Sequence, residues 1–258
     1  MIDERAIIDK SARIAENVKI GPYAVIGKNV EIGAGSSIGP HAVINGPTII
    51  GKNNKIYQFA SVGEDPQDKK YQGEATTLEI GDENIIREFV TINRGTLQGG
   101  GKTTIGNQNL LMAYVHIAHD CHIKHNTIFG NSASLSGHVI VEDYAILSGF
   151  SLVHQYCIIG AYSFVAAATG ISKDVLPYIL ISGVGHDSKV FGLNVVGLKR
   201  QGFSDETISY LKRAYKVIFR QNLTVPDAIT ELKSIVKECP EIQIMIDLLE
   251  KSERGISR

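Results

Sequence analysis

The sequence predicts an all-β parallel β-helix followed by a small α-helical C-terminal domain. Two columns of residues, both with a period of six, predict the β-helix, and a change to helical spacing after Phe191 predicts the second part. A period of six fits neither the 3.6 residues of an α-helix turn nor the two-residue alternation of a flat strand. It fits a triangular coil with three short strands per turn, the hexapeptide repeat.

The first column consists of large apolar residues. Every sixth residue is aliphatic from Ile2 to Val62, and the register returns at Ile80. It then shifts by one residue and runs from Ile105 to Ile171. Such residues stack along the axis of the coil, and the repeats make roughly nine coils, a prism about 40 Å long.

The second column stands four positions after the first and holds small or β-branched residues, such as Ala24 and Val139. We expect these residues to fill the remaining interior. Glycine often follows the aliphatic residue directly, as at Gly21, Gly33 and Gly160. We expect a corner there that needs a permissive backbone.

Two excursions interrupt the repeat, at residues 63–79 and 93–104. They are either tolerated surface insertions or, as is more usual for loops on a rigid scaffold, carriers of binding residues. The predicted domains are a β-helix over residues 1–190, with both excursions, and a helical domain over residues 191–258.

The helical domain is predicted from three amphipathic segments. Ser204 has the position of an N-cap, with Phe203 and Ile208 placed as a hydrophobic staple. Further segments follow at 227–238 and after Pro240. We expect these helices to cover the open sheet edge at the last coil.

Composition restricts the function. The net charge of -1 gives no basic field for nucleic acid. No stretch approaches the ~18 apolar residues of a membrane span, and the N-terminus lacks the pattern of a secretory signal. The 3 cysteines are too few for a disulfide framework, and Cys121 and Cys157 fall in the small interior column as buried fillers. These features indicate a cytoplasmic protein.

Histidines supply the candidate chemistry. His119 and His138 fall outside both columns and are about one coil apart, so we expect them on the same outer face at roughly a strand spacing. His154 lies about one coil further. An external column of histidines suits proton transfer near neutral pH. Asp120 either orients the imidazole of His119 or is an exposed turn aspartate.

Other chemistries fit less well. A zinc site of the kind found in β-helix carbonic anhydrases needs an H-x4-H pair, which the sequence lacks, so we predict no metal.

The sequence contains no G-x-S-x-G elbow that would support a covalent acyl-enzyme. Direct attack by a substrate hydroxyl remains, with a histidine as general base and no cofactor. His41 and His125 are explained as solvated surface imidazoles.

At this point several motifs together resemble one family, that of acyl-carrier-protein:UDP-N-acetylglucosamine O-acyltransferases, over essentially the whole chain. They are I-Y-Q-F-A-S-V-G at 56–63, Q-D-x-K-Y at 67–71, I-A-H-D-C at 117–121, L-x-G-H-V at 135–139, V-H-Q-Y-C-I-I-G-A at 153–161 and G-L-K-R-Q-G-F-S at 197–204. The resemblance implies a left-handed coil and a homotrimer with active sites between neighbouring prisms. It implies transfer of a (3-hydroxy)acyl group from the phosphopantetheine arm of acyl carrier protein to the 3-hydroxyl of UDP-N-acetylglucosamine, the first step of lipid A biosynthesis.

The resemblance also implies the roles of individual residues. His119 is the general base, Asp120 orients it, and the Gly137 N–H is the oxyanion donor. Substrate contacts fall to Gln67, Asp68, Lys70, His116, His138, His154, Gln155, Asn194 and Arg200. Ala167 and Phe164 limit the acyl chain, where the best-known members have a glycine pair nearby. Gln201 stands where the family often has a second arginine.

Three alternatives remain open. The sister N-acyltransferase of the same pathway carries an additional N-terminal uridine-binding domain, for which a repeat that begins at Ile2 leaves no room. An acetyl-CoA transferase would lack the Q-D-x-K-Y loop. A non-catalytic β-helix would show flat ladders of threonine or asparagine outside, in place of histidines and a basic loop.

Overall fold

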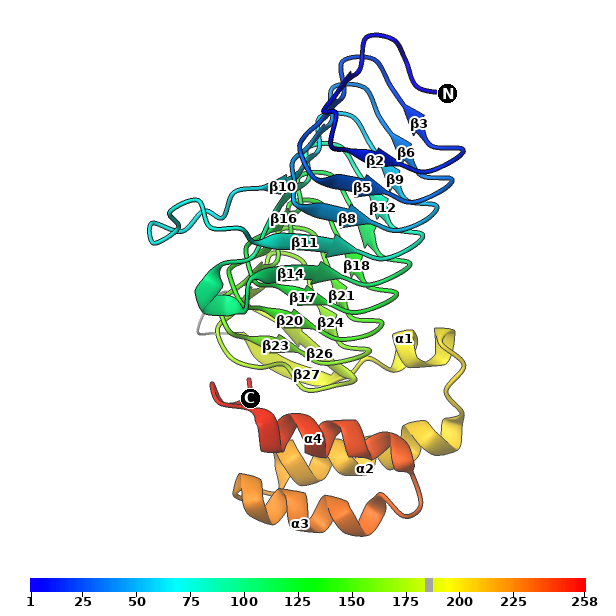
Figure 1. Ribbon diagram of the computed structural model, residues 1–258. Helices are drawn as coiled ribbons and strands as arrows, with labels where there is room; N and C mark the ends of the chain where they lie inside the picture. The colour runs from blue at the N-terminus through cyan, green and yellow to red at the C-terminus, as the bar shows by residue number, and fades with distance from the viewer. Residues whose placement is uncertain (184–187) are drawn as a thin grey trace.

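The computed structural model describes residues 1–183 and 188–258. Its coils stack into a three-sided prism, with the helices packed at one end and the N-terminus at the other (Figure 1). Strand pairing is parallel from coil to coil, and the β26–β27 pair is antiparallel. The predicted left-handed parallel β-helix with a small helical C-terminal part is confirmed.

The prism has three sheets. Sheet 1 contains β1 Ile7–Ile8, β4 Val25–Ile26, β7 Val43–Ile44, β10 Ser61–Glu64, β13 Thr91–Asn93, β16 His116–Ile117, β19 Ser134–Leu135, β22 Leu152–Val153 and β25 Gly170–Ile171. Sheet 2 contains β2 Arg13–Ile14, β5 Val30–Ile32, β8 Thr48–Ile50, β11 Thr77–Ile80, β14 Lys102–Ile105, β17 His122–Ile123, β20 Ile140–Val141 and β23 Ile158–Ile159. Sheet 3 contains β3 Lys19–Ile20, β6 Ser37–Ile38, β9 Lys55–Ile56, β12 Ile85–Ile86, β15 Leu110–Leu111, β18 Ile128–Phe129, β21 Ile146–Leu147, β24 Phe164–Val165, β26 Ile179–Ser182 and β27 Lys189–Leu193.

Both predicted columns line the interior. Ile44, Ile117 and their equivalents in other coils are buried, as are the small residues four positions later, such as Cys121. Ile2 pairs with Ile20, the residue one coil onward in its column, but it is 46% exposed because it lies in the first coil at the end of the stack. The register thus specifies the interior wherever a coil lies between two others.

Glycine after the aliphatic residue has a different cause from the one predicted. Gly21, Gly33 and Gly160 do not have positive φ. A Cβ on Gly160 would lie 2.4 Å from the backbone nitrogen of Pro177 on the next coil. These glycines therefore permit close stacking of coils, and they do not relieve strain at a corner.

The corners use another position, three residues after the aliphatic one. It adopts left-handed φ with side chains of many kinds, including His41 at 57°, Asp120 at 59° and His138 at 63°. Left-handed φ is uncommon for residues other than glycine. Many of these corners hydrogen-bond the neighbouring coil, as when the His138 N–H donates to the His119 carbonyl at 3.1 Å.

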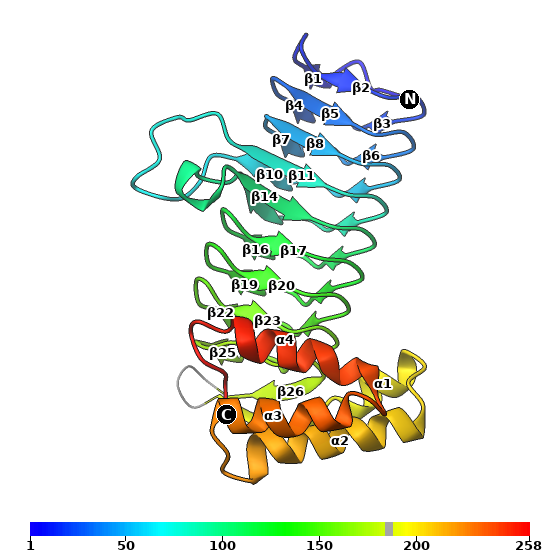
Figure 2. The ribbon, with the colours of Figure 1, turned by 60° about the horizontal axis from the view of Figure 1, so that its bottom comes forward.

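The two excursions leave the prism between sheets 1 and 2. Residues 65–76 connect β10 to β11, and residues 94–101 connect β13 to β14 and include η1 Leu97–Gly99. The ends of both predicted excursions belong to these strands. The two segments lie side by side on one edge of the prism (Figures 1 and 2).

The C-terminal part contains α1 Val195–Arg200, α2 Asp205–Arg220, α3 Val225–Ile235, η3 Pro240–Ile242 and α4 Gln243–Lys251. Ser204 caps α2 as predicted, accepting from the Thr207 N–H at 2.9 Å. The short helix α1 was not predicted. The predicted boundary at 190/191 falls inside β27, which pairs with β26 and so extends the sheet beyond that point.

The helices cover the last coil, as expected. The Tyr178 hydroxyl donates to the Glu241 carbonyl at 2.9 Å, and the Ser252 hydroxyl binds the buried carboxylate of Asp174. The backbone of Asp174 also pairs with Gly255 and Ser257. The chain end is therefore held against the edge of the final coil.

Candidate active site

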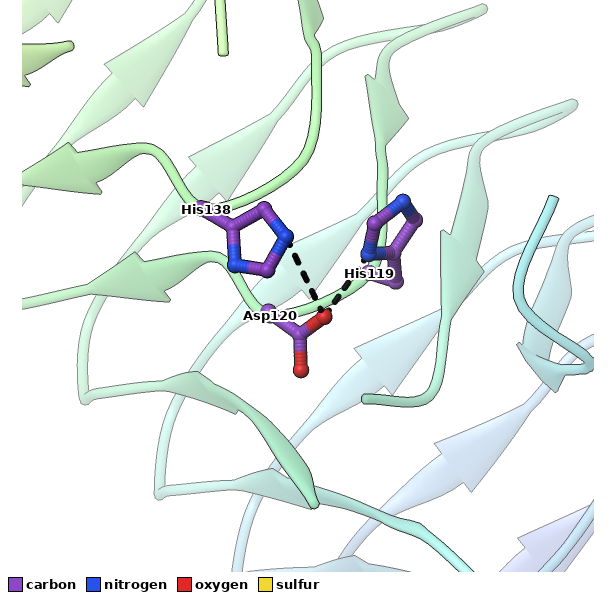
Figure 3. Close-up of side chains that lie close together, drawn as sticks. All are labelled: His119, Asp120 and His138. Atoms are coloured by element: carbon purple, nitrogen blue, oxygen red, sulfur yellow. Dashed lines mark hydrogen bonds and ion pairs between the residues drawn. The ribbon is translucent and has the colours of Figure 1, made fainter. Parts of the chain in front are cut away.

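Three side chains meet at the corner between sheets 1 and 2, after β16 and β19 (Figure 3). His119 Nδ1 lies 2.7 Å from Asp120 Oδ2, and His138 Nε2 lies 3.8 Å from the same oxygen. The imidazoles of His119 and His138 cross edge to face with centroids 5.2 Å apart. The prediction that these histidines share an outer face is confirmed by this geometry.

Asp120 is buried, so the exposed-turn explanation is wrong. Its side chain is 1% exposed because the second excursion lies over it. Asp120 Oδ1 accepts from the Thr96 N–H at 2.8 Å, and Oδ2 accepts from the Thr96 hydroxyl at 2.7 Å. Burial alone would raise the pKa of this carboxyl, but the hydrogen bonds from His119 and Thr96 lower it below its usual value.

An ionised Asp120 settles which nitrogen of His119 carries the proton. A carboxylate only accepts hydrogen bonds, so Nδ1 of His119 must be the donor. Nε2 then carries the free lone pair of the neutral imidazole. The side chain of His119 is 13% exposed, so a substrate can reach it. An imidazole held in this way by a carboxylate can act as a general base, and that role stays a prediction for His119.

His138 is partly buried beside the dyad. Burial lowers the pKa of its imidazole, and the charges of Asp120 and Asp68 partly oppose the shift. Its ring stacks on Tyr156, with centroids 4.4 Å apart. Tyr156, one full coil onward, therefore continues the column that the sequence assigned to His154.

Gly137 packs directly against the imidazole of His119. A Cβ at this position would lie 2.6 Å from His119 Cε1, so any side chain would displace the imidazole. The Gly137 N–H has no hydrogen-bond acceptor within residues 1–183 and 188–258. The same holds for the equivalent corner N–H of His119 in the part described. A free donor thus lies next to the imidazole of His119, and its role as oxyanion donor stays a prediction.

A groove of about 820 Å³ lies over the outer face of sheet 1, and Ser136, the neighbour of Gly137 in the chain, is among its lining residues. His116 and His154 both line it, with Arg254 from the chain end at its far side. His116 Nδ1 lies 2.7 Å from the Thr91 hydroxyl, and burial, then the nearby His119, lowers the pKa of His116. His154 belongs to the groove and not to the cluster at the corner.

A second cavity of about 290 Å³ lies between sheet 3 and α1. Asn194, Arg200 and Phe164 line it together with Gln201. Asn194 is the N-cap of α1, accepting from the Gly197 N–H at 3.1 Å and donating to the Tyr162 carbonyl at 3.1 Å. Within one chain, the predicted nucleotide and carrier residues therefore lie on a different face from the histidines.

The remaining predicted residues are more exposed. The first excursion carries Gln67, Asp68 and Lys70, where the Lys70 N–H donates to the Asp68 carboxylate at 3.0 Å. Gln155 and Ala167 are exposed on the outside of the prism. None of these five residues touches the dyad through a hydrogen bond within the described chain.

The corner cluster also has the composition of a metal site. One ligand atom each from His119, Asp120 and His138 lies within 4.8 Å of the others. Both carboxylate oxygens already accept hydrogen bonds, and His119 directs Nδ1 at one of them. This arrangement favours a hydrogen-bonded dyad, and the expectation of no metal stays a prediction.

Known proteins share the hexapeptide repeat and the overall fold of this chain. The family model described as bacterial transferase hexapeptide (six repeats) matches residues 11–46 and 102–137, and the one described as UDP N-acetylglucosamine O-acyltransferase, domain 2, matches residues 174–257. An acyl-[acyl-carrier-protein]--UDP-N-acetylglucosamine O-acyltransferase of Halorhodospira halophila is 53% identical over 260 residues, which cover 100% of this chain and 99% of that protein. The chain belongs to this acyltransferase family.

Solved structures agree. The UDP-N-acetylglucosamine O-acyltransferase of Moraxella catarrhalis is 49% identical with a TM-score of 0.98, and LpxA of Acinetobacter baumannii is 50% identical with a TM-score of 0.97. In both, the match covers 100% of this chain and 99% of the other. Similarity of this extent groups the acyltransferase described here with the O-acyltransferases and not with the sister N-acyltransferases. In the parts of this acyltransferase that the structure describes, no helix has the length and apolar character needed to span a bilayer.

Proposed function

We propose that the chain transfers a (3-hydroxy)acyl group from acyl carrier protein to the 3-hydroxyl of UDP-N-acetylglucosamine, the first step of lipid A biosynthesis. The names of its relatives specify both substrates. The observation that carries the proposal is the His119–Asp120 dyad, which holds Nδ1 of a partly exposed imidazole against a carboxylate and leaves Nε2 free to accept a proton.

The proposed reaction is direct acyl transfer. His119 Nε2 removes the proton of the sugar 3-hydroxyl as its oxygen attacks the thioester carbonyl. The Gly137 N–H donates to the developing oxyanion. When the tetrahedral intermediate collapses, the carbon–sulfur bond breaks and His119 returns the proton to the leaving pantetheine sulfur. No group is oxidised or reduced, and Asp120 keeps its charge to stabilise the imidazolium.

A homotrimer completes the site in this proposal. The dyad lies at the corner between sheets 1 and 2 and the groove lies over sheet 1, whereas Asn194 and Arg200 lie at sheet 3. When one prism packs against the next, a face of one chain meets a different face of its neighbour. Such packing supports a cleft in which both groups of residues contact the same pair of substrates.

Other parts of the proposal rest on the family resemblance. They are acyl carrier protein as the partner, its phosphopantetheine arm as the carrier of the acyl group, a cytoplasmic location and the absence of a further cofactor. Asp68, Lys70 and Gln67 are assigned to the sugar nucleotide, and Ala167 with Phe164 to the end of the acyl chain.

The test is the mass of the product formed from a panel of acyl carrier thioesters. UDP-N-acetylglucosamine and its 3-amino analogue are offered separately as acceptors. A single acyl ester on the first acceptor is expected. Exclusive transfer to the amine would replace the proposal with N-acylation, and no transfer to either acceptor would refute it.

A further inference from the structure

The second excursion contacts both functional parts of the corner. Two of its residues, Arg94 and Thr96, are buried although the segment projects from the prism. Thr96 contacts the carboxylate of the dyad, and Arg94 contacts the first excursion. Neither contact was visible from the sequence, since each joins positions more than 20 residues apart.

Thr96 holds Asp120 through two bonds. Its N–H lies 2.8 Å from Asp120 Oδ1 and its hydroxyl 2.7 Å from Oδ2, and Thr96 is 2% exposed. The same hydroxyl accepts from the Gly99 N–H at 3.2 Å, which caps η1. A Cβ on Gly99 would lie 2.1 Å from the carboxyl carbon of Asp120. The segment from Thr96 to Gly99 therefore packs closely around the carboxylate of Asp120 and fixes its orientation.

Arg94 holds the first excursion. It is 6% exposed, and its guanidinium donates to the Gly63 carbonyl, to the Asp65 carboxylate and, at 3.1 Å, to the Tyr71 hydroxyl. That hydroxyl in turn donates to the Glu74 carbonyl at 3.1 Å. A buried charge is costly unless it is paired. The guanidinium of Arg94 therefore favours the position of the first excursion in which Asp65 and Tyr71 lie within hydrogen-bond distance of it.

We propose that the second excursion is the positioning element for both halves of the reaction. Thr96 fixes Asp120, and through it the imidazole of His119. Arg94 fixes the residues 65–76 that carry Asp68 and Lys70. The inference rests on the proposed function, because it assigns the dyad to proton transfer and the loop to the sugar nucleotide. Both Arg94 and Thr96 act through other residues and touch no substrate.

The two residues should then affect different kinetic constants. Thr96→Val removes the hydroxyl but keeps the shape and the N–H. Loss of a hydrogen bond to a charged group should lower kcat about 10–100-fold with little change in KM. Thr96→Ser keeps the hydroxyl and should retain most of the rate. Thr104→Val is the matched control, because Thr104 binds His122 on sheet 2 at 2.9 Å, away from the dyad.

Substitution of Arg94 should weaken binding of the acceptor substrate. Arg94→Gln should raise the KM for UDP-N-acetylglucosamine about 10-fold or more and leave kcat at saturation close to wild type. Tyr71→Phe removes one hydroxyl contact of the same clamp and is expected to fold even if Arg94→Gln does not. Arg87→Lys is the control, since Arg87 pairs with Glu88 outside both excursions.

A double-mutant cycle separates positioning from general stability. In an Asp120→Asn background, Thr96→Val should lower kcat little further, because the carboxylate that Thr96 positions is already absent. Wild-type kcat in Thr96→Val, additive losses in the cycle, or a Tyr71→Phe variant with unchanged KM would each overturn the inference. The wild-type product and the His119→Ala rate, measured in parallel, show separately whether the proposed function itself holds.

Discussion

His119 and Asp120 are neighbours in the chain, yet Nδ1 of one lies 2.7 Å from Oδ2 of the other. In an extended strand, consecutive side chains point to opposite faces and could not meet in this way. Here Asp120 occupies the left-handed corner position with φ 59°, which turns its side chain back toward its neighbour. The coil geometry itself thus builds the dyad from two consecutive residues.

The first prediction concerns the base. His119→Ala should reduce kcat about 10²–10⁴-fold, the usual contribution of a positioned general base. Thermal unfolding should change little, because His119 lies outside the packed interior. His122→Ala is the control, as that imidazole is partly exposed on sheet 2 and bound to Thr104. Near-normal turnover in correctly assembled His119→Ala would exclude it as the base.

The interior could be predicted from the sequence because every coil buries the same two positions. The register that identified Ile44 and Cys121 as interior residues also placed His119 and His138 outside. The chemistry of the corner could not be predicted in full. Thr96 reaches Asp120 across 24 positions and an irregular segment, for which the repeat contains no information.

Other differences have local causes. Helix α1 spans only Val195–Arg200, too short to show an amphipathic period, and Asn194 is its N-cap. The spacing of the histidines alone does not point to Tyr156, because the external column continues there with a different aromatic side chain. An offset of one whole coil, 18 residues, from His138 leads to Tyr156 and would have found it.

The second prediction concerns the first excursion. Lys70→Ala and Asp68→Ala should weaken binding of UDP-N-acetylglucosamine, because these residues project on the loop that the proposal assigns to the acceptor. Isothermal titration with the sugar nucleotide measures the affinity. Lys69→Ala removes an adjacent exposed lysine and should behave as wild type. Wild-type affinity in both variants would make residues 65–76 a tolerated insertion.

The third prediction is a dependence of stability on pH. Burial lowers the pKa of both His116 and His138 in the folded chain, whereas the pKa of an unfolded histidine is about 6.5. As the pH falls below that value, the unfolded state takes up protons first, so this part of the stability is present above about pH 6.5 and is lost below it. Thermal unfolding between pH 8 and 5 should show a smaller decline in His116→Gln and His138→Gln. Identical declines in wild type and both variants would contradict the prediction.

The last prediction concerns the length of the acyl chain. Ala167 is exposed at the corner between sheets 3 and 1, next to Ala168, which lines the groove over sheet 1, while Phe164 lines the cavity by α1. A methyl group at Ala167 occupies space that the terminal carbons of a longer chain need. Ala167→Gly should therefore shift preference toward donors two carbons longer by about 10–200-fold, with little change in the rate on short donors.

Ala34→Gly is the control, because it removes a methyl group from an equivalent corner position far from the groove and should leave the preference unchanged. If the profile of Ala167→Gly equals that of the wild type, the chain end must be limited by another residue of the cleft, with Phe164 the next to substitute.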